Sequence, residues 1–168
     1  PKAHFALDYH GAPGLRITPV LSADLKTAEI HAEAWVAGTA QSVQFTLGEE
    51  TLSAAVTDGK AEGTFKLENV HLWDGVNDPY LYKMQATLDS GDAVEANFGC
   101  RTIAFDAEKG FILNGRSYPL CGAARHQDRQ GLGNALTEKE HDEDMALLRE
   151  MGANTVRLAH YQHAQYFY

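Results

Sequence analysis

One capped helix between two short apolar strands constrains the fold more than any other feature of the sequence. Residues 117–122 form the first apolar stretch, and residues 156–158 form the second. Between them, Thr137 and Glu140 have the spacing of a capping box, in which the two residues satisfy each other's backbone N–H groups where a helix begins. A strand, a helix and a strand in this order form a right-handed unit with two parallel strands.

The predicted helix is amphipathic, because His141, Met145, Leu148 and Met151 recur at helical spacing, and Gly152 provides the left-handed residue that ends it. A parallel sheet is stable only when both faces are covered, and two strands with one helix cannot cover them. A complete (β/α)8 barrel needs roughly 250 residues, and this chain has 168. We therefore expect the sequence to stop partway through a larger α/β fold.

The first part of the chain has a different pattern, with short alternating strands and close turns. Residues 27–37 alternate between apolar side chains and polar or aromatic ones, as in a half-buried strand. Residues 58–59, Asp-Gly, are a strong signal for a hairpin turn, with residues 65–67 on the returning strand. About seven such strands predict a mainly β fold. We expect an immunoglobulin-like antiparallel β-sandwich over residues 1–105 and a second, incomplete domain over residues 106–168.

Charge and composition argue against several classes of protein. The chain has 14 Lys and Arg residues against 23 Asp and Glu residues, and its formal charge is −9. This charge repels phosphate backbones and anionic membranes, so we expect no nucleic-acid or membrane partner. No stretch approaches the roughly 20 apolar residues of a membrane-spanning helix. Cys100 and Cys121 fit no metal or redox motif, and we expect two free thiols.

Both apolar stretches of the second domain lead into dense polar runs. Residues 125–128 read Arg-His-Gln-Asp, and residues 157–163 contain an arginine and two histidines. The active site of a parallel α/β protein lies at the carboxyl ends of its strands, so these runs mark a candidate site. Strand alternation turns Arg157 away from Val156 and Leu158. We expect the Arg157 side chain to be buried and therefore to need an anionic partner.

Several ordered motifs resemble one known family. The segments GFILNGRSYPLCGAARHQD and DMALLREMGANTVRLAHYQH, preceded by FGCRTIAF, resemble the part of family 2 glycoside hydrolases that joins an immunoglobulin-like domain to the catalytic barrel. Upstream, HGAPGLRITP and DPYLYKMQATL resemble the edges of that family's sandwich domain. The resemblance implies that residues 106–168 are the first βαβ unit of a truncated (β/α)8, or TIM, barrel.

Within the family, RHQD together with RLAHYQH is more similar to β-galactosidases than to β-glucuronidases or β-mannosidases. Gln162 stands where many members have proline, a change that resembles a β-galactosidase subgroup. Ala124 stands where the usual residue is asparagine, so the contact made by that side chain in other members does not carry over. The implied parent is a retaining β-galactosidase that hydrolyses terminal β-galactosides.

The resemblance also implies roles for individual residues. His126 and His160 are similar to histidines that bind sugar hydroxyls, and Arg157 is similar to the arginine that orients the nucleophilic carboxylate. Asp128 lies near the mouth of the site by its position and is a further candidate for the substrate pocket. A retaining mechanism needs two carboxyl groups about 5 Å apart, and in the family both lie on later strands. We therefore expect no catalytic carboxylate in this chain and no activity from it in isolation.

Other interpretations stay open at this point. One is a non-catalytic β-sandwich module that binds carbohydrate or protein, and another is a different family 2 specificity. The helical carboxylates of residues 142–144 are expected to be solvated charges, and His160 with His163 lacks the further ligand that a zinc site needs. We expect no cofactor here, since the resemblance assigns the family's magnesium or sodium ions to absent segments. Exposed apolar surface of the truncated barrel predicts self-association.

Overall fold

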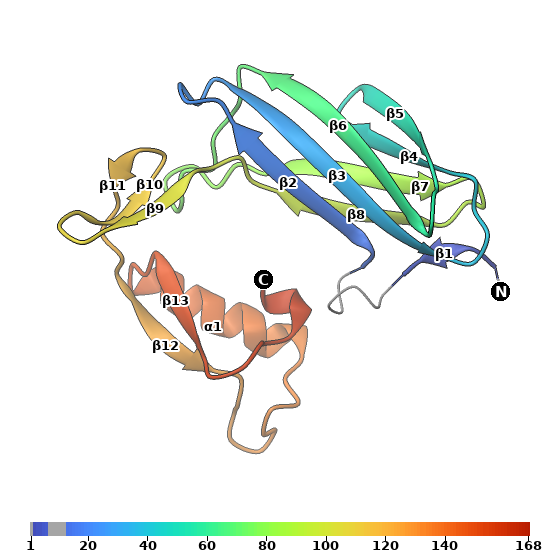
Figure 1. The fold of residues 1–168 in the computed structure, drawn as a ribbon. Helices are drawn as coiled ribbons and strands as arrows, with labels where there is room; N and C mark the ends of the chain where they lie inside the picture. Colours follow the sequence, from blue (N-terminus) through green and yellow to red (C-terminus); the bar gives the residue numbers. More distant parts are fainter. Residues whose placement is uncertain (1, 7–12) are drawn as a thin grey trace. The chain divides into compact units, whose positions relative to one another are not determined.

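A computed structural model describes residues 2–6 and 13–168 of the chain (Figure 1). It divides into two compact units, which are described separately below. The first comprises residues 1–104 and 113–116, and the second comprises residues 105–112 and 117–168. The segment HGAPGLRITP begins in residues 10–12, which lie outside the described residues.

The first unit is a sandwich of two antiparallel sheets, which face each other as two layers in Figure 1. The mainly β fold expected from the sequence is confirmed. One sheet contains four strands, which are β1 (His4–Phe5), β2 (Leu15–Leu21), β3 (Thr27–Ala37) and β6 (Lys60–Glu68). The other has the order β5-β4-β7-β8 and contains β4 (Ser42–Leu47), β5 (Glu50–Ala55), β7 (Tyr82–Leu88) and β8 (Ala93–Phe98).

Strict alternation along β3 places every second side chain in the core between the sheets. The inward residues Ile30, Ala32, Ala34 and Val36 are buried, as their period of two predicts. They pack in one cluster with the inward side chains of the opposite sheet, among which Phe45 is fully buried. Because a shift of one residue would turn this whole set outward, the core also fixes the register of β3 against β2 and β6.

The predicted turn at residues 58–59 is present, but the hairpin around it is not. Asp58 and Gly59 both have positive φ, 51° and 74°, and Thr57 pairs with Lys60 across the turn. After this turn, however, β6 pairs with β3 in the other sheet rather than returning along β5. The turn thus carries the chain from one layer of the sandwich to the other. Local turn chemistry specifies the reversal but not the strand that the returning segment will join.

The second unit contains a parallel strand pair with a helix, and a small antiparallel sheet lies at its junction with the first unit in sequence. The small sheet has the order β11-β10-β9, with β9 (Ile103–Asp106), β10 (Gly110–Leu113) and β11 (Arg116–Ser117). The remaining elements are β12 (Gly122–His126), α1 (Glu138–Glu150), β13 (Thr155–Ala159) and the short 3-10 helix η1 (Gln165–Phe167). β12 and β13 pair in parallel, as the strand-helix-strand order predicts.

The first parallel strand begins later than expected, at Gly122, which is the last residue of the predicted stretch 117–122 rather than its first. Pro119 has no N–H group for a strand ladder. Its carbonyl instead accepts a hydrogen bond from the Asn154 side-chain amide at 2.8 Å, and the Asn154 side-chain oxygen accepts from the Cys121 N–H at 2.8 Å. The Asn154 side chain therefore takes the place of the ladder just before β12 starts.

The helix α1 starts where the capping box predicts. The Glu140 carboxylate accepts hydrogen bonds from the backbone N–H of Thr137 at 2.8 Å and from its hydroxyl at 2.6 Å. These bonds, chiefly the one from the hydroxyl, lower the pKa of Glu140 below its ordinary value. Met145 and Met151 of the predicted apolar stripe are nonetheless exposed. In the part of the chain that the structure describes, no helix is long and apolar enough to span a membrane.

Phe45 provides a test of the sandwich core. Phe45→Ala removes a fully buried ring and leaves a cavity, so we expect the free energy of unfolding of the first unit to fall by about 3–5 kcal/mol. Urea unfolding followed by circular dichroism of the β signal measures this change. Val20→Ala, at a half-exposed position on β2, is the control and should change the same free energy by less than about 0.5 kcal/mol. Equal effects of the two substitutions would contradict the assigned core.

The two cysteines should differ sharply in reactivity. Both thiols are free in the structure, as expected, and burial raises the pKa of the Cys100 thiol to about 11, whereas Cys121 is exposed. Since the thiolate is the reactive form, a disulfide reagent such as DTNB at pH 8 should titrate one thiol in the native chain and two in guanidinium. Cys121→Ser should abolish the native reaction. Rapid native labelling of Cys100 would show that the sandwich core is open to the reagent.

Candidate sugar-binding site

The site lies at the carboxyl edge of the β12–β13 pair. The parallel register places Gly122 opposite Thr155 and His126 opposite Ala159, so both strands end at the same level. The residue that follows β13 is His160, which is thereby brought beside His126. Strand geometry therefore gathers two of the predicted site residues from segments that are more than thirty positions apart in sequence.

The two histidines are in direct ring contact. The His126 and His160 rings have centroids 5.1 Å apart and an interplanar angle of 81°, which is an edge-to-face arrangement. The Arg157 guanidinium donates a hydrogen bond from Nη2 to Nδ1 of His160 at 3.1 Å. Because that nitrogen accepts, the proton of a neutral His160 ring is on Nε2, which can donate to a hydroxyl. The predicted set of His126, His160 and Arg157 is thus brought together.

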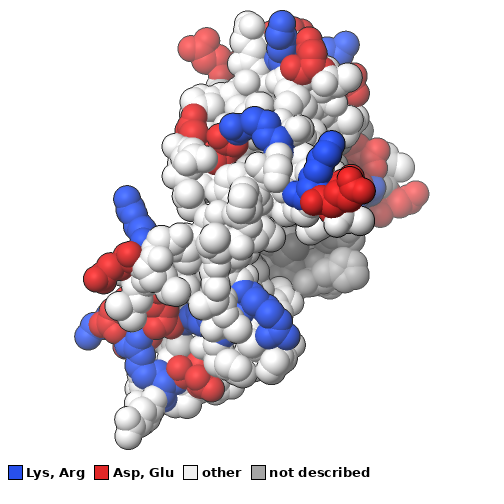
Figure 2. Space-filling model, turned by 90° about the vertical axis from the view of Figure 1, so that its left-hand side faces the viewer, with Lys and Arg blue, Asp and Glu red and all other residues white. Residues whose placement is uncertain are grey.

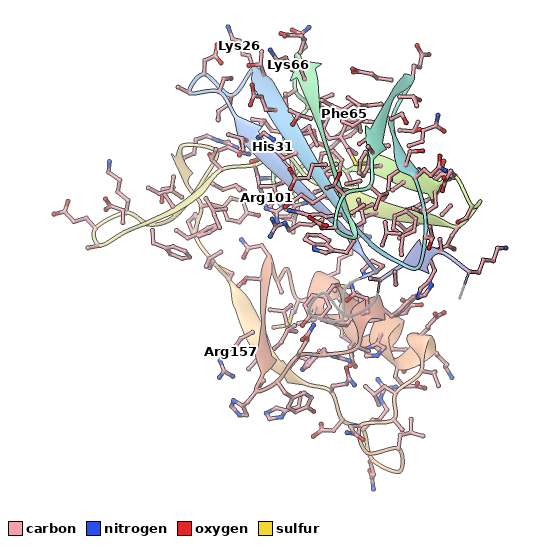
Figure 3. The ribbon with its side chains drawn as sticks, turned by 45° about the vertical axis from the view of Figure 1, so that its right-hand side comes forward. Lys26, His31, Phe65, Lys66, Arg101 and Arg157 are labelled. Carbon is pink, nitrogen blue, oxygen red and sulfur yellow. The ribbon has the colours of Figure 1, made fainter. Side chains whose placement is uncertain are left out.

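The sequence-based expectation that Arg157 is buried is wrong for this chain. Its side chain is exposed and projects from the strand pair on the side away from α1 (Figure 3). The alternation itself is confirmed, since Val156 and Leu158 are partly buried. Within the described part of the second unit, the two parallel strands leave one face of their sheet uncovered, and Arg157 lies on that face. Asp128 is also exposed, and its carboxylate has no hydrogen bond or ion pair with any residue that the structure describes.

The buried cation of the second unit is Arg125, which the sequence did not single out. Arg125 is 7% exposed and lies on the opposite face of β12 from His126. Its guanidinium donates from Nε and Nη2 to Oδ2 of Asp144, at 2.9 and 2.7 Å. It also packs over the Phe167 ring, with Cζ 4.1 Å from the centroid. The rule that a buried cation needs an anionic partner holds, but it applies to a different arginine and to a helical aspartate.

The acidic residues of α1 are accordingly not all solvated charges, as the sequence interpretation had them. Asp144 pairs with Arg125 and also accepts from Nη2 of Arg129 at 3.0 Å, while Glu143 pairs with Nη1 of Arg129. Asp142 accepts a hydrogen bond from the hydroxyl of Tyr166 at 3.0 Å, and this contact raises the pKa of the tyrosine. The sequence feature that could have indicated these ion pairs is the spacing of the carboxylates along a helix that faces the strand carrying Arg125.

The described residues provide no metal centre. Among residues 2–6 and 13–168, no group of three or more His, Cys, Asp or Glu side chains is arranged to hold a metal ion. His160 and His163 also face different partners, since His160 contacts Arg157 and His163 contacts Arg125. On the face shown in Figure 2, acidic and basic side chains are interspersed, so this face has no extended basic patch of the kind that phosphate backbones require.

Comparison with known proteins places the chain in a family. Residues 13–101 match the family described as "Glycosyl hydrolases family 2", and residues 106–168 match "Glycosyl hydrolases family 2, TIM barrel domain". The chain therefore belongs to glycoside hydrolase family 2. The expected fold, a sandwich followed by the start of a TIM barrel, agrees with these matches.

Similar proteins carry two different activities in their names. A β-glucuronidase of Bacteroides fragilis is 45% identical over 106 residues, covering 61% of this chain and 15% of that protein. A β-galactosidase of Staphylococcus xylosus is 32% identical over 152 residues, covering 88% of this chain and 15% of that protein. The crystal structure of an FMN-binding β-glucuronidase from Facaelibacterium prausnitzii L2-6 superposes with a TM-score of 0.88 at 36% identity, covering 99% of this chain and 27% of that one. The chain thus spans about a seventh of the length of the Bacteroides fragilis and Staphylococcus xylosus enzymes.

Asp144 should be essential for the packing of α1 against β12. Asp144→Ala leaves the Arg125 guanidinium buried without its anion, so we expect the second unit to lose about 3–5 kcal/mol of unfolding free energy. Hydrogen exchange of the α1 amides in the intact chain measures this loss directly. Glu143→Ala removes a neighbouring carboxylate that is itself exposed and should leave the exchange rates nearly unchanged. If both substitutions have the same small effect, the buried pair does not stabilise the unit.

Proposed function

We propose that this chain supplies part of the sugar-binding site of a retaining β-glycosidase, and that the two carboxylates which break the glycosidic bond lie on barrel strands outside this sequence. The observation that carries the proposal is the contact between the His126 and His160 rings at the carboxyl edge of β12 and β13, with Arg157 bonded to His160. Membership of glycoside hydrolase family 2 supports it.

The proposed roles follow from the hydrogen-bonding capacity of each group. A neutral imidazole offers one donor and one acceptor, and a sugar hydroxyl can meet either. His160, whose Nδ1 already accepts from Arg157, keeps the N–H at Nε2 for a hydroxyl. Arg157 carries further N–H donors that are suited to a carboxylate, and a charge-assisted bond there would orient the nucleophile. Its exposure in this chain is consistent with a partner on an absent strand.

We propose a β-galactoside as the first substrate, on the similarity of the residue runs RHQD and RLAHYQH to β-galactosidases. A β-glucuronide is the second candidate, because the relative from Bacteroides fragilis is named for that activity. The two sugars differ at C6, where a glucuronide carries a carboxylate and a galactoside carries a hydroxyl. Discrimination therefore depends on whether a free cation or a neutral donor faces that position in the completed site.

The test is activity of the chain alone and of the longer protein. The 168-residue chain should not hydrolyse 4-nitrophenyl β-galactoside or β-glucuronide, whereas the protein extended through the remaining barrel should hydrolyse one of them. In the extended protein, His160→Ala should lower kcat/KM by about tenfold or more, as the loss of a substrate hydrogen bond predicts. The control is His31→Ala, at a half-exposed position on β3, which should leave kcat/KM unchanged.

Three results would count against the proposal. Turnover by the short chain would show that it contains its own carboxylate pair. An extended protein that hydrolyses neither substrate would remove the proposed activity. Binding of galactosides by the short chain at undiminished affinity after His126→Ala and His160→Ala, measured by calorimetry, would favour the alternative of a binding module based on the sandwich.

A further inference from the structure

Arg125 connects four segments of the second unit behind the histidine pair. Besides Asp144 on α1, its guanidinium contacts two ring nitrogens, with Nη1 3.0 Å from Nδ1 of His163 and Nη2 3.0 Å from Nδ1 of His141. The flat face of the guanidinium lies over Phe167 of η1. Strand β12, helix α1, the loop after β13 and η1 therefore meet at a single side chain.

The chemistry of arginine fixes the state of both histidine rings. A guanidinium has five N–H donors and no acceptor, so each Nδ1 that it contacts must accept. A ring that accepts at Nδ1 is neutral and carries its proton on Nε2. His141 and His163 are 3% and 5% exposed, and both Nε2 atoms are buried without a hydrogen-bond partner in the described part of the chain. Each ring is thus held in one tautomer by a cation.

This arrangement is not the one that stability alone would favour. An apolar side chain at position 125 would bury no charge and would need no anion from α1. The structure instead places a cation there, satisfies it with three side chains and leaves two buried Nε2 atoms unpaired. The role of this cation follows from the segments that it contacts.

Those segments are the ones that carry the proposed sugar-binding histidines. Arg125 immediately precedes His126, and His163 lies three residues after His160. Besides the bond between Arg125 and His163, a second bond joins the same two segments. The Gln127 side-chain oxygen accepts a hydrogen bond from the backbone N–H of Ala164 at 2.6 Å. The end of β12 and the loop after β13 are therefore tied together directly behind the edge-to-face ring pair.

We infer that Arg125 is a positioning residue, which sets the relative placement of His126 and His160 through its bond to His163, and that it does so only while His141 and His163 are neutral. The inference rests on the proposed function, because it assigns Arg125 a purpose in sugar binding. Protonation of either ring at Nδ1 removes the acceptor and places a second positive charge against the guanidinium. Protonation of His163 therefore breaks the bond that ties the two strand ends together, and protonation of His141 breaks the bond between Arg125 and His141 of α1.

Several other ionisable groups surround this cluster and are part of the same balance. Asp144 of α1 faces the guanidinium directly, and Arg129, from the loop after β12, shares that carboxylate. From the C-terminal segment, the ring of Tyr161 lies 5.4 Å from His163, and that of Tyr166 lies 6.1 Å from His141. Among the described residues, Asp144 is the one carboxylate bonded to Arg125, so a protonated histidine would compete with Arg125 for it.

Nitrogen NMR of the histidine rings in the intact 168-residue chain tests the inference without any assay of activity. In mildly alkaline buffer, His141 and His163 should each show a single tautomer with the proton on Nε2. As the pH falls, the signals of His126 and His160 should shift in a step that coincides with protonation of His141 or His163, in addition to any step of their own.

Substitution of Arg125 supplies the comparison. Arg125→Lys keeps the charge but loses the planar set of donors, and Arg125→Met keeps the approximate volume without any donor. In both variants we expect the single tautomer and the coupled step to be lost, with a shift of the His126 and His160 signals at high pH. Arg149→Lys, on the exposed end of α1, is the matched control and should reproduce the original spectra.

The outcomes separate this inference from the proposed function. An Nδ1–H tautomer at His141 or His163 in the unsubstituted chain would overturn it, whether or not either variant folds. Unchanged His126 and His160 signals in a folded Arg125→Met variant would overturn it as well. Failure of the extended protein to hydrolyse any glycoside would remove the proposed function while leaving the tautomers and the coupling as measured.

Discussion

A positive charge enclosed between a strand and a helix determines how the second unit is built. The Arg125 side chain reaches the layer between β12 and α1, where water does not solvate it, so its donors must be met by protein groups. Asp144 supplies the compensating charge from the helix, and His141 and His163 supply neutral acceptors. One guanidinium, and not apolar packing alone, therefore determines which side of α1 and of the C-terminal loop faces the strand pair.

Local sequence rules predict much of this chain because they act over a few residues. Three of its features depend only on residues that are close together in the sequence. They are the alternation along residues 27–37, the turn at residues 58–59 and the capping box of Thr137 and Glu140. All three are present in the structure. The place of the candidate site follows from the same reasoning, since the carboxyl ends of neighbouring parallel strands must meet.

Features that depend on distant partners were not predictable in the same way. The turn at residues 58–59 is formed, yet the choice of β3 as the partner of β6 is made by core packing between the sheets. Likewise, a strand containing Arg125 and His126 in succession places one on each face, but the period does not say which face a helix will cover. From the sequence, Arg157 is expected to be buried on the assumption that further barrel elements cover this residue. The elements that bury Arg125 instead lie within the chain.

Gly122 fixes the register of the two parallel strands β12 and β13. A Cβ atom at this position would overlap the carbonyl oxygen of Thr155, so only a residue without a side chain can sit there. If β12 slipped by one position along β13, Ala123 would meet that carbonyl and be rejected by steric overlap. Such a slip would also exchange the faces of Arg125 and His126 and put the cation in the proposed sugar site. The glycine therefore acts as a register stop, which permits only the alignment in which His126 lies on the proposed substrate face.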